Sequence, residues 1–132
     1  MWLPDINVWI RYLNPHPSPV KDHFRQHPAV RIFLCGIVQA ELYFGAWKSA
    51  RRDENLALLD ELSRGFYSLP FDDDAARHCG RIRSELQQAG TPIGGYDLQI
   101  AAIALSRDLA LITHNTREFS RVKGLILEDW EV

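Results

Sequence analysis

The stretch GTPIGGYDLQIAAIALSRDLALIT, residues 90–113, indicates the fold class of this chain most clearly. It begins with a loop rich in glycine and proline and continues with the apolar helical run LQIAAIAL (98–105). It ends with LALIT (109–113), a short apolar run that is typical of a buried strand. Gly90 stands where a left-handed cap would end a preceding helix. A loop, a helix and a buried strand in this order are typical of an α/β sheet.

Similar segments lie on either side of this stretch. Further strands are predicted at Arg31–Cys35 and Tyr67–Leu69, with weaker candidates at Trp2–Leu3 and Leu125–Leu127. Helical patterns lie between them, at Ile6–Leu13, 36–46, Asn55–Arg64 and Asp74–Gln88. Strands that alternate with helices need crossover connections, so we expect a mostly parallel central sheet covered by helices on both faces. The prediction is a three-layer α/β/α fold in a single domain over residues 1–132.

The composition narrows the class of protein. With 46% hydrophobic and 24% charged residues, the chain is typical of globular domains. No apolar run approaches the roughly 20 residues of a membrane-spanning helix, and the start lacks a basic segment before its apolar stretch, so we expect no membrane partner and a cytoplasmic location. Cys35 and Cys79 show no CxxC spacing, and we expect both to be small buried hydrophobic residues rather than zinc ligands.

The charge distribution allows only local contact with nucleic acid. A net charge of -2 does not favour a protein that coats RNA or DNA, because phosphate binding depends on clustered Lys and Arg. Basic clusters occur at residues 48–52 and 117–123. Each cluster is either a solvated surface or a local RNA contact.

Three acidic residues stand where chemistry is expected. Asp5 follows the first predicted strand and Asp97 precedes the helix 98–105, and both positions also suit an ordinary helix cap. Glu41, in GIVQAELYFGA (36–46), shares a helical face with Ile37 and Val38. A carboxylate on a buried face needs a cation or hydrogen-bond donors, so Glu41 is expected either to bind a metal or to form a buried salt bridge.

A fourth candidate region follows the strand 109–113. Asn115 and Glu118 can face the crevice at the end of that strand, and the Thr113 hydroxyl can orient a carboxylate or a water there. Each of these residues is also typical of a turn or a cap. Oxygen-rich sites of this kind suit Mg²⁺ or Mn²⁺, with Asp5 and Asp97 as direct ligands and Glu41 acting directly or through water.

These segments together resemble the PIN-domain ribonucleases of the VapC toxin type. The matching segments are PDINVWI, VQAELYFGA, GTPIGGYDLQIAAIAL and LITHNTREFSRVKGLILEDW, which cover essentially the whole chain. The resemblance implies a PIN fold, RNA cleavage with a divalent metal to leave a 5′-phosphate and a 3′-hydroxyl, and a homodimeric toxin. It also implies a small VapB-type antitoxin that occludes the active site.

The resemblance also assigns residues. Asp5, Glu41 and Asp97 fall on the acidic triad of the family, and Glu118 falls on an acidic position that part of the family uses. Asn115 lies where other members carry Asp, and Asn7 matches an Asn that helps to order the loop of the first acid. Two departures are Ile6, which replaces a common hydroxyl residue, and His114, which stands where Asn is common.

Two alternatives stay open. One is a PIN-like component of a repressor complex that has lost catalysis. The other is a phosphoacceptor signalling domain, which has a similar length and a parallel sheet. That class needs an early acid pair and a Lys after the last strands, whereas this chain has one early acid and no Lys between the LALIT strand and Lys123.

Overall fold

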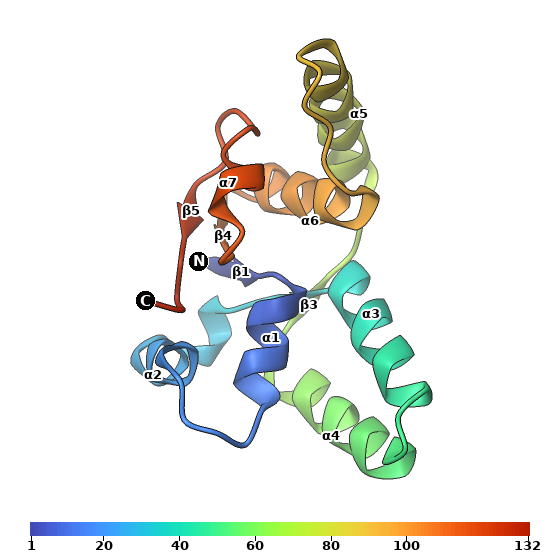
Figure 1. Cartoon of the computed structure of the whole chain (residues 1–132), viewed down its shortest axis with the longest axis vertical. Coiled ribbons are helices and arrows are strands. Elements are labelled where there is room, and N and C mark those ends of the chain that lie inside the picture. Colours follow the sequence, from blue (N-terminus) through green and yellow to red (C-terminus); the bar gives the residue numbers. More distant parts are fainter.

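Five short parallel strands form the centre of the computed structural model, which describes all residues 1–132 (Figure 1). The strands are β1 (Trp2–Pro4), β2 (Leu34–Cys35), β3 (Ser68–Leu69), β4 (Ala110–Ile112) and β5 (Leu127–Glu128). β4 lies between β1 and β5, and β2 pairs with β3. A parallel bridge between Trp2 and Ile32 joins the two groups, which gives the strand order β3-β2-β1-β4-β5. The predicted parallel α/β class is confirmed.

Seven α-helices connect these strands. They are α1 (Ile6–Leu13), α2 (Pro19–Gln26), α3 (Gly36–Trp47), α4 (Arg52–Gly65), α5 (Asp73–Gln88), α6 (Gly95–Ser106) and α7 (Thr116–Phe119), with a 3₁₀ turn at Ala29–Arg31. Figure 1 shows α3 and α4 as a hairpin on one side of the molecule and α5 projecting beyond α6 at the other end. None of the helices is both long and apolar enough to span a membrane.

Two local predictions need correction, and one helix was not predicted. The strand predicted at Arg31–Cys35 is shorter, because the amide of Arg31 donates to the Pro28 carbonyl (3.0 Å) and closes the 3₁₀ turn. Helix α6 begins at Gly95, so Asp97 lies in its first turn and not before it. Helix α2 was not predicted, although Ser18 caps it and Pro19 occupies its first position. The left-handed cap at Gly90 is confirmed by its φ of 73°.

One hydrophobic cluster of 29 buried residues supports the sheet. Strand β4 is buried along its whole length, and α6 buries residues 100–104 without interruption. A helix that is apolar on all sides has to lie inside the core, which fixes the position of its first turn. Cys35 is buried in this core, as expected, whereas Cys79 packs against it only half-buried, and both are free thiols.

Candidate active site

Asp5 lies at the carboxyl end of β1, and its side chain caps α1. Its Oδ1 accepts a hydrogen bond from the Val8 amide (3.1 Å), and its own amide donates to the Ile112 carbonyl of β4 (2.9 Å). Only 7% of the residue is exposed. The helix-cap expectation for Asp5 is therefore confirmed, and the cap uses only one of its two carboxylate oxygens.

The environment of Asp5 opposes its ionisation. Burial raises the pKa of Asp5 most, and the charges of Asp97 and Glu131 raise it further, whereas hydrogen bonds from Thr113 and Val8 lower it. The balance leaves the pKa above the ordinary value of 3.8. A buried carboxylate with negative neighbours is stabilised when a cation comes close to it.

Asp97 is held in the first turn of α6, where Gly94 is the N-cap residue. Asp97 is half-buried, and burial raises the pKa of its carboxyl, with a further increase from the charge of Glu118. Asp97 therefore interacts with Asp5 on one side and with Glu118 on the other. The start of α6 brings a second acid to the carboxyl end of β1.

The loop after β4 supplies the remaining polar groups of this site. The Thr113 side chain is fully buried, and its Oγ1 accepts a hydrogen bond from the Asn115 amide (3.0 Å). The Asn115 side-chain amide donates to Oε2 of Glu118 (3.0 Å), which lies in α7. Thr113, Asn115 and Glu118 therefore form one connected network beside Asp5 and Asp97.

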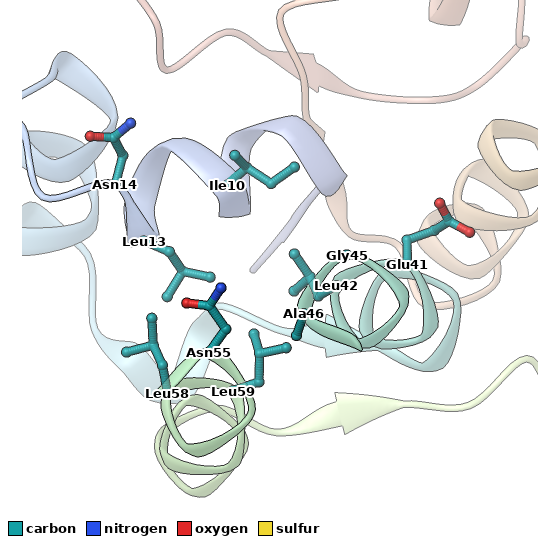
Figure 2. Close-up of a pocket in the computed structure, with 10 residues that line it drawn as sticks. All are labelled: Ile10, Leu13, Asn14, Glu41, Leu42, Gly45, Ala46, Asn55, Leu58 and Leu59. Atoms are coloured by element: carbon teal, nitrogen blue, oxygen red, sulfur yellow. The ribbon is translucent and has the colours of Figure 1, made fainter. Parts of the chain in front are cut away.

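Glu41 lies on α3, at the edge of a groove that runs between α1, α3 and α4. It is half-buried rather than buried, because the buried stripe of α3 is formed by Val38, Leu42 and Ala46. Figure 2 shows its carboxylate pointing away from the other residues of the groove. None of the salt bridges in the structure involves Glu41, so the buried salt-bridge interpretation is wrong.

Further residues beside the site were missed from the sequence. Glu131, near the C-terminus, raises the pKa of Asp5 through its charge and forms an ion pair with Arg11 of α1. Asp129 was also missed, and it pairs with His114, which lies in the same pocket as Asn7; the sequence had indicated both His114 and Asn7. The acids directly after β5 could have been predicted as site residues. β5 pairs with β4 in parallel, so the carboxyl ends of both strands lie at the same edge of the sheet.

The donor set suits a hard cation. No three His, Cys, Asp or Glu side chains converge into a complete metal site. Mg²⁺ does not require one, because it commonly uses one or two carboxylates and fills its other positions with waters and substrate phosphates. The acidic chain from Asp5 through Asp97 to Glu118, with the raised pKa values of the two Asp residues, fits such an ion.

Comparison with known proteins identifies the family. The PIN domain family model matches residues 3–125. The tRNA(fMet)-specific endonuclease VapC of Salmonella typhimurium is 38% identical over 96% of this chain and 95% of that protein. Ribonuclease VapC2 of Haemophilus influenzae is 35% identical over 98% of this chain and 97% of that protein.

Solved structures give the same result. The DNA-bound VapBC structure from Salmonella typhimurium has a chain that matches with a TM-score of 0.91 and 37% identity, over 98% of this chain and 97% of that one. A chain of VapBC2 from Rickettsia felis, bound to a promoter DNA fragment, matches with a TM-score of 0.90 and 32% identity over 98% of both chains. This protein belongs to the PIN domain family and, within it, to the VapC ribonucleases.

Proposed function

We propose that this protein is an endoribonuclease, dependent on Mg²⁺ or Mn²⁺, that acts in the cytoplasm as the toxin of a toxin–antitoxin pair through a single PIN domain. The observation that carries the proposal is the effect of Asp97 on the pKa of Asp5, and of Glu118 on the pKa of Asp97, beside the carboxyl ends of β1 and β4. Carboxylates whose charges raise one another's pKa are stabilised by a bound cation. The ribonuclease names of the VapC relatives support RNA as the substrate.

In this proposal, each polar residue has a separate task. Asp5 and Asp97 hold the metal ion, and Glu41 assists directly or through a water. When bound, a divalent ion supplies an activated water for attack on the phosphodiester and neutralises charge on the scissile phosphate.

Other residues of the chain keep these carboxylates in place. Glu118 of α7 supports a ligand or a second ion and is itself oriented by the Asn115 amide. The Thr113 hydroxyl orients Asp5 and opposes part of the rise in its pKa, since a hydrogen bond to a carboxylate favours the charged form. Asn7 is assigned to the order of the Asp5 loop by the family resemblance alone.

We also propose that the antitoxin occupies the groove next to Glu41 (Figure 2). This groove has a volume of about 370 Å³ and six of its ten lining residues are apolar. Ile10 is 49% exposed and Leu58 is 42% exposed there, so the groove presents apolar surface that a partner would cover. An apolar segment of a VapB-type antitoxin with a basic residue would fill the groove and pair with Glu41.

The matching chains in the solved VapBC structures from Salmonella typhimurium and Rickettsia felis support an antitoxin partner of this kind. A homodimer is expected from the family resemblance, and light scattering on the purified protein tests it.

The deciding experiment is cleavage of total RNA by the purified protein with Mg²⁺, with Mn²⁺ and with EDTA. We expect cleavage only with a divalent ion, and its loss in D5N and D97N while the fold is retained. Asp74→Asn is the matched control, because Asp74 is an exposed acid that pairs with Arg77 on α5. Cleavage by D5N or D97N at the wild-type rate would contradict the assignment.

The same assay separates the alternatives. A catalytically silent repressor component would leave RNA intact under all conditions, and the presence of all the acidic residues favours the nuclease instead. The phosphoacceptor alternative has lost its support, because the family match covers residues 3–125.

A further inference from the structure

A second pocket opens beside the acidic site, between α1, the loop after β4 and the C-terminal residues. Its volume is about 460 Å³, and Ile10 is its only hydrophobic lining residue. The charged lining residues are Arg11, His114 and Glu131. Glu131 is close enough to the acidic site to raise the pKa of Asp5, so the pocket adjoins the proposed reaction centre.

Arg11 is anchored in this pocket with part of its hydrogen-bonding capacity unused. Its Nε lies 2.8 Å from Oε1 of Glu131. The Glu131 side chain is only 13% exposed, whereas the Arg11 side chain is 58% exposed. The ion pair uses Nε and leaves both terminal guanidinium nitrogens available for a ligand, in the geometry that suits a phosphate.

His114 is held in a similar way. Its Nδ1 lies 2.9 Å from Oδ2 of Asp129, which leaves Nε2 free, and its side chain is 63% exposed. The hydrogen bond with Asp129, together with the charge of Glu131, raises the pKa of His114 and favours its cationic form. Oδ1 of Asp129 also accepts from the Glu131 amide (2.9 Å), so the two anchoring acids belong to one turn.

We propose that Arg11 and His114 bind a phosphate of the RNA strand that flanks the cleaved position. This inference rests on the proposed ribonuclease function. Asp5, Asp97 and Glu118 repel RNA when no metal is bound, so the strand needs cationic contacts close to them. Asn115 connects the two places, because its side chain orients Glu118 and also lines the pocket.

The test measures binding of a short fluorescent single-stranded RNA by anisotropy, in EDTA so that no cleavage occurs, at several salt concentrations. We expect R11Q and H114Q each to weaken binding by about fivefold, and to reduce the slope of log affinity against log salt by about 0.7. Arg25→Gln is the matched control, because Arg25 is an arginine on α2 with 66% of its side chain exposed and an ion pair to Asp22. R25Q is expected to bind like the wild type.

Steady-state cleavage with Mg²⁺ gives a second measurement. A phosphate contact away from the cleaved bond predicts a higher KM with a smaller change in kcat. Thermal unfolding of each variant separates lost binding from lost structure. If R11Q proves unstable, H114Q decides the question, because its partner Asp129 is more exposed than Glu131.

Each outcome has one meaning. If the wild-type protein cleaves RNA, and R11Q and H114Q keep its affinity, salt slope and KM, the proposed phosphate subsite is wrong and the proposed nuclease function stands. A wild-type protein that neither binds nor cuts RNA would contradict the proposed function, and the subsite with it.

Discussion

Asp5 and Thr113 lie side by side because the residues before them, Pro4 and Ile112, are paired in the parallel ladder of β1 and β4. The two strands are far apart in the sequence, yet their carboxyl ends lie at the same edge of the sheet. A carboxylate whose pKa is raised by burial is placed beside a fully buried hydroxyl that lowers it. This relationship makes Thr113 a positioning residue for the proposed site.

Thr113→Val tests that role with little change of shape. The Asn115 amide loses its acceptor and Asp5 loses the neighbouring hydroxyl that lowers its pKa, so we expect the free energy of unfolding to fall by about 1–2 kcal/mol. We expect cleavage at neutral pH to fall by about tenfold, as is usual when a residue that orients a metal ligand is changed. Thr113→Ser keeps the hydroxyl and should retain most of the activity. Equal losses in both variants would point to packing as the cause.

The pH dependence of stability follows from the raised pKa values of Asp5 and Asp97. From the ordinary value of 3.8 up to the raised values, the folded protein binds more protons than the unfolded chain. The free energy of unfolding of the metal-free protein therefore falls as pH rises through this window and then levels off. Asp97→Asn removes one of the two groups, so D97N should melt at a higher temperature than the wild type at neutral pH.

The gain in D97N should shrink as the pH is lowered toward about 4. Melting curves in EDTA at a series of pH values measure the effect, with D74N as the control that should show no gain. A lower melting temperature for D97N at neutral pH would mean that the Asp97 carboxylate stabilises the metal-free fold.

Metal binding is expected to reverse this destabilisation. Mg²⁺ or Mn²⁺ at 100 times the dissociation constant should raise the free energy of unfolding of the wild type by about 2.7 kcal/mol. D5N and D97N should gain much less, because each has lost one of the proposed ligands, whereas D74N should gain as much as the wild type. Thermal shift with added metal, and its reversal by EDTA, measures this without any assay of activity.

The proposed antitoxin groove is tested by Leu58→Glu. Leu58 is 42% exposed, so the charge is tolerated in the free protein but opposes an apolar partner. We expect RNA cleavage to be unchanged and the affinity for the cognate antitoxin to fall by at least about tenfold. Ala57→Glu is the control, because Ala57 is exposed on the same helix but does not line the groove. Equal inhibition of L58E and A57E by the antitoxin would place the partner elsewhere.

Much of the fold could be predicted from local sequence. The bounds of α1, the left-handed cap at Gly90 and the strand within 109–113 were all predicted, because apolar periodicity, caps and turn residues act over a few positions. The parallel class followed from the alternation of helices and strands. The start of α6 was misplaced by three residues, because Gly95, Tyr96 and Asp97 carry no apolar signal of their own.

The interactions within the site required the tertiary structure. The sequence indicated Asp5, Asp97 and Glu118 as polar residues at the ends of elements, but their mutual charge effects depend on how β1, β4 and α6 pack. Acids after β5 were visible in the sequence, but the effect of Glu131 on the pKa of Asp5 and its pairing with Arg11 depend on how the end of the chain packs beside α1. Helix and strand formation depend on neighbours in the chain, whereas burial and the pKa of a carboxyl depend on neighbours in space, which only the folded sheet brings together.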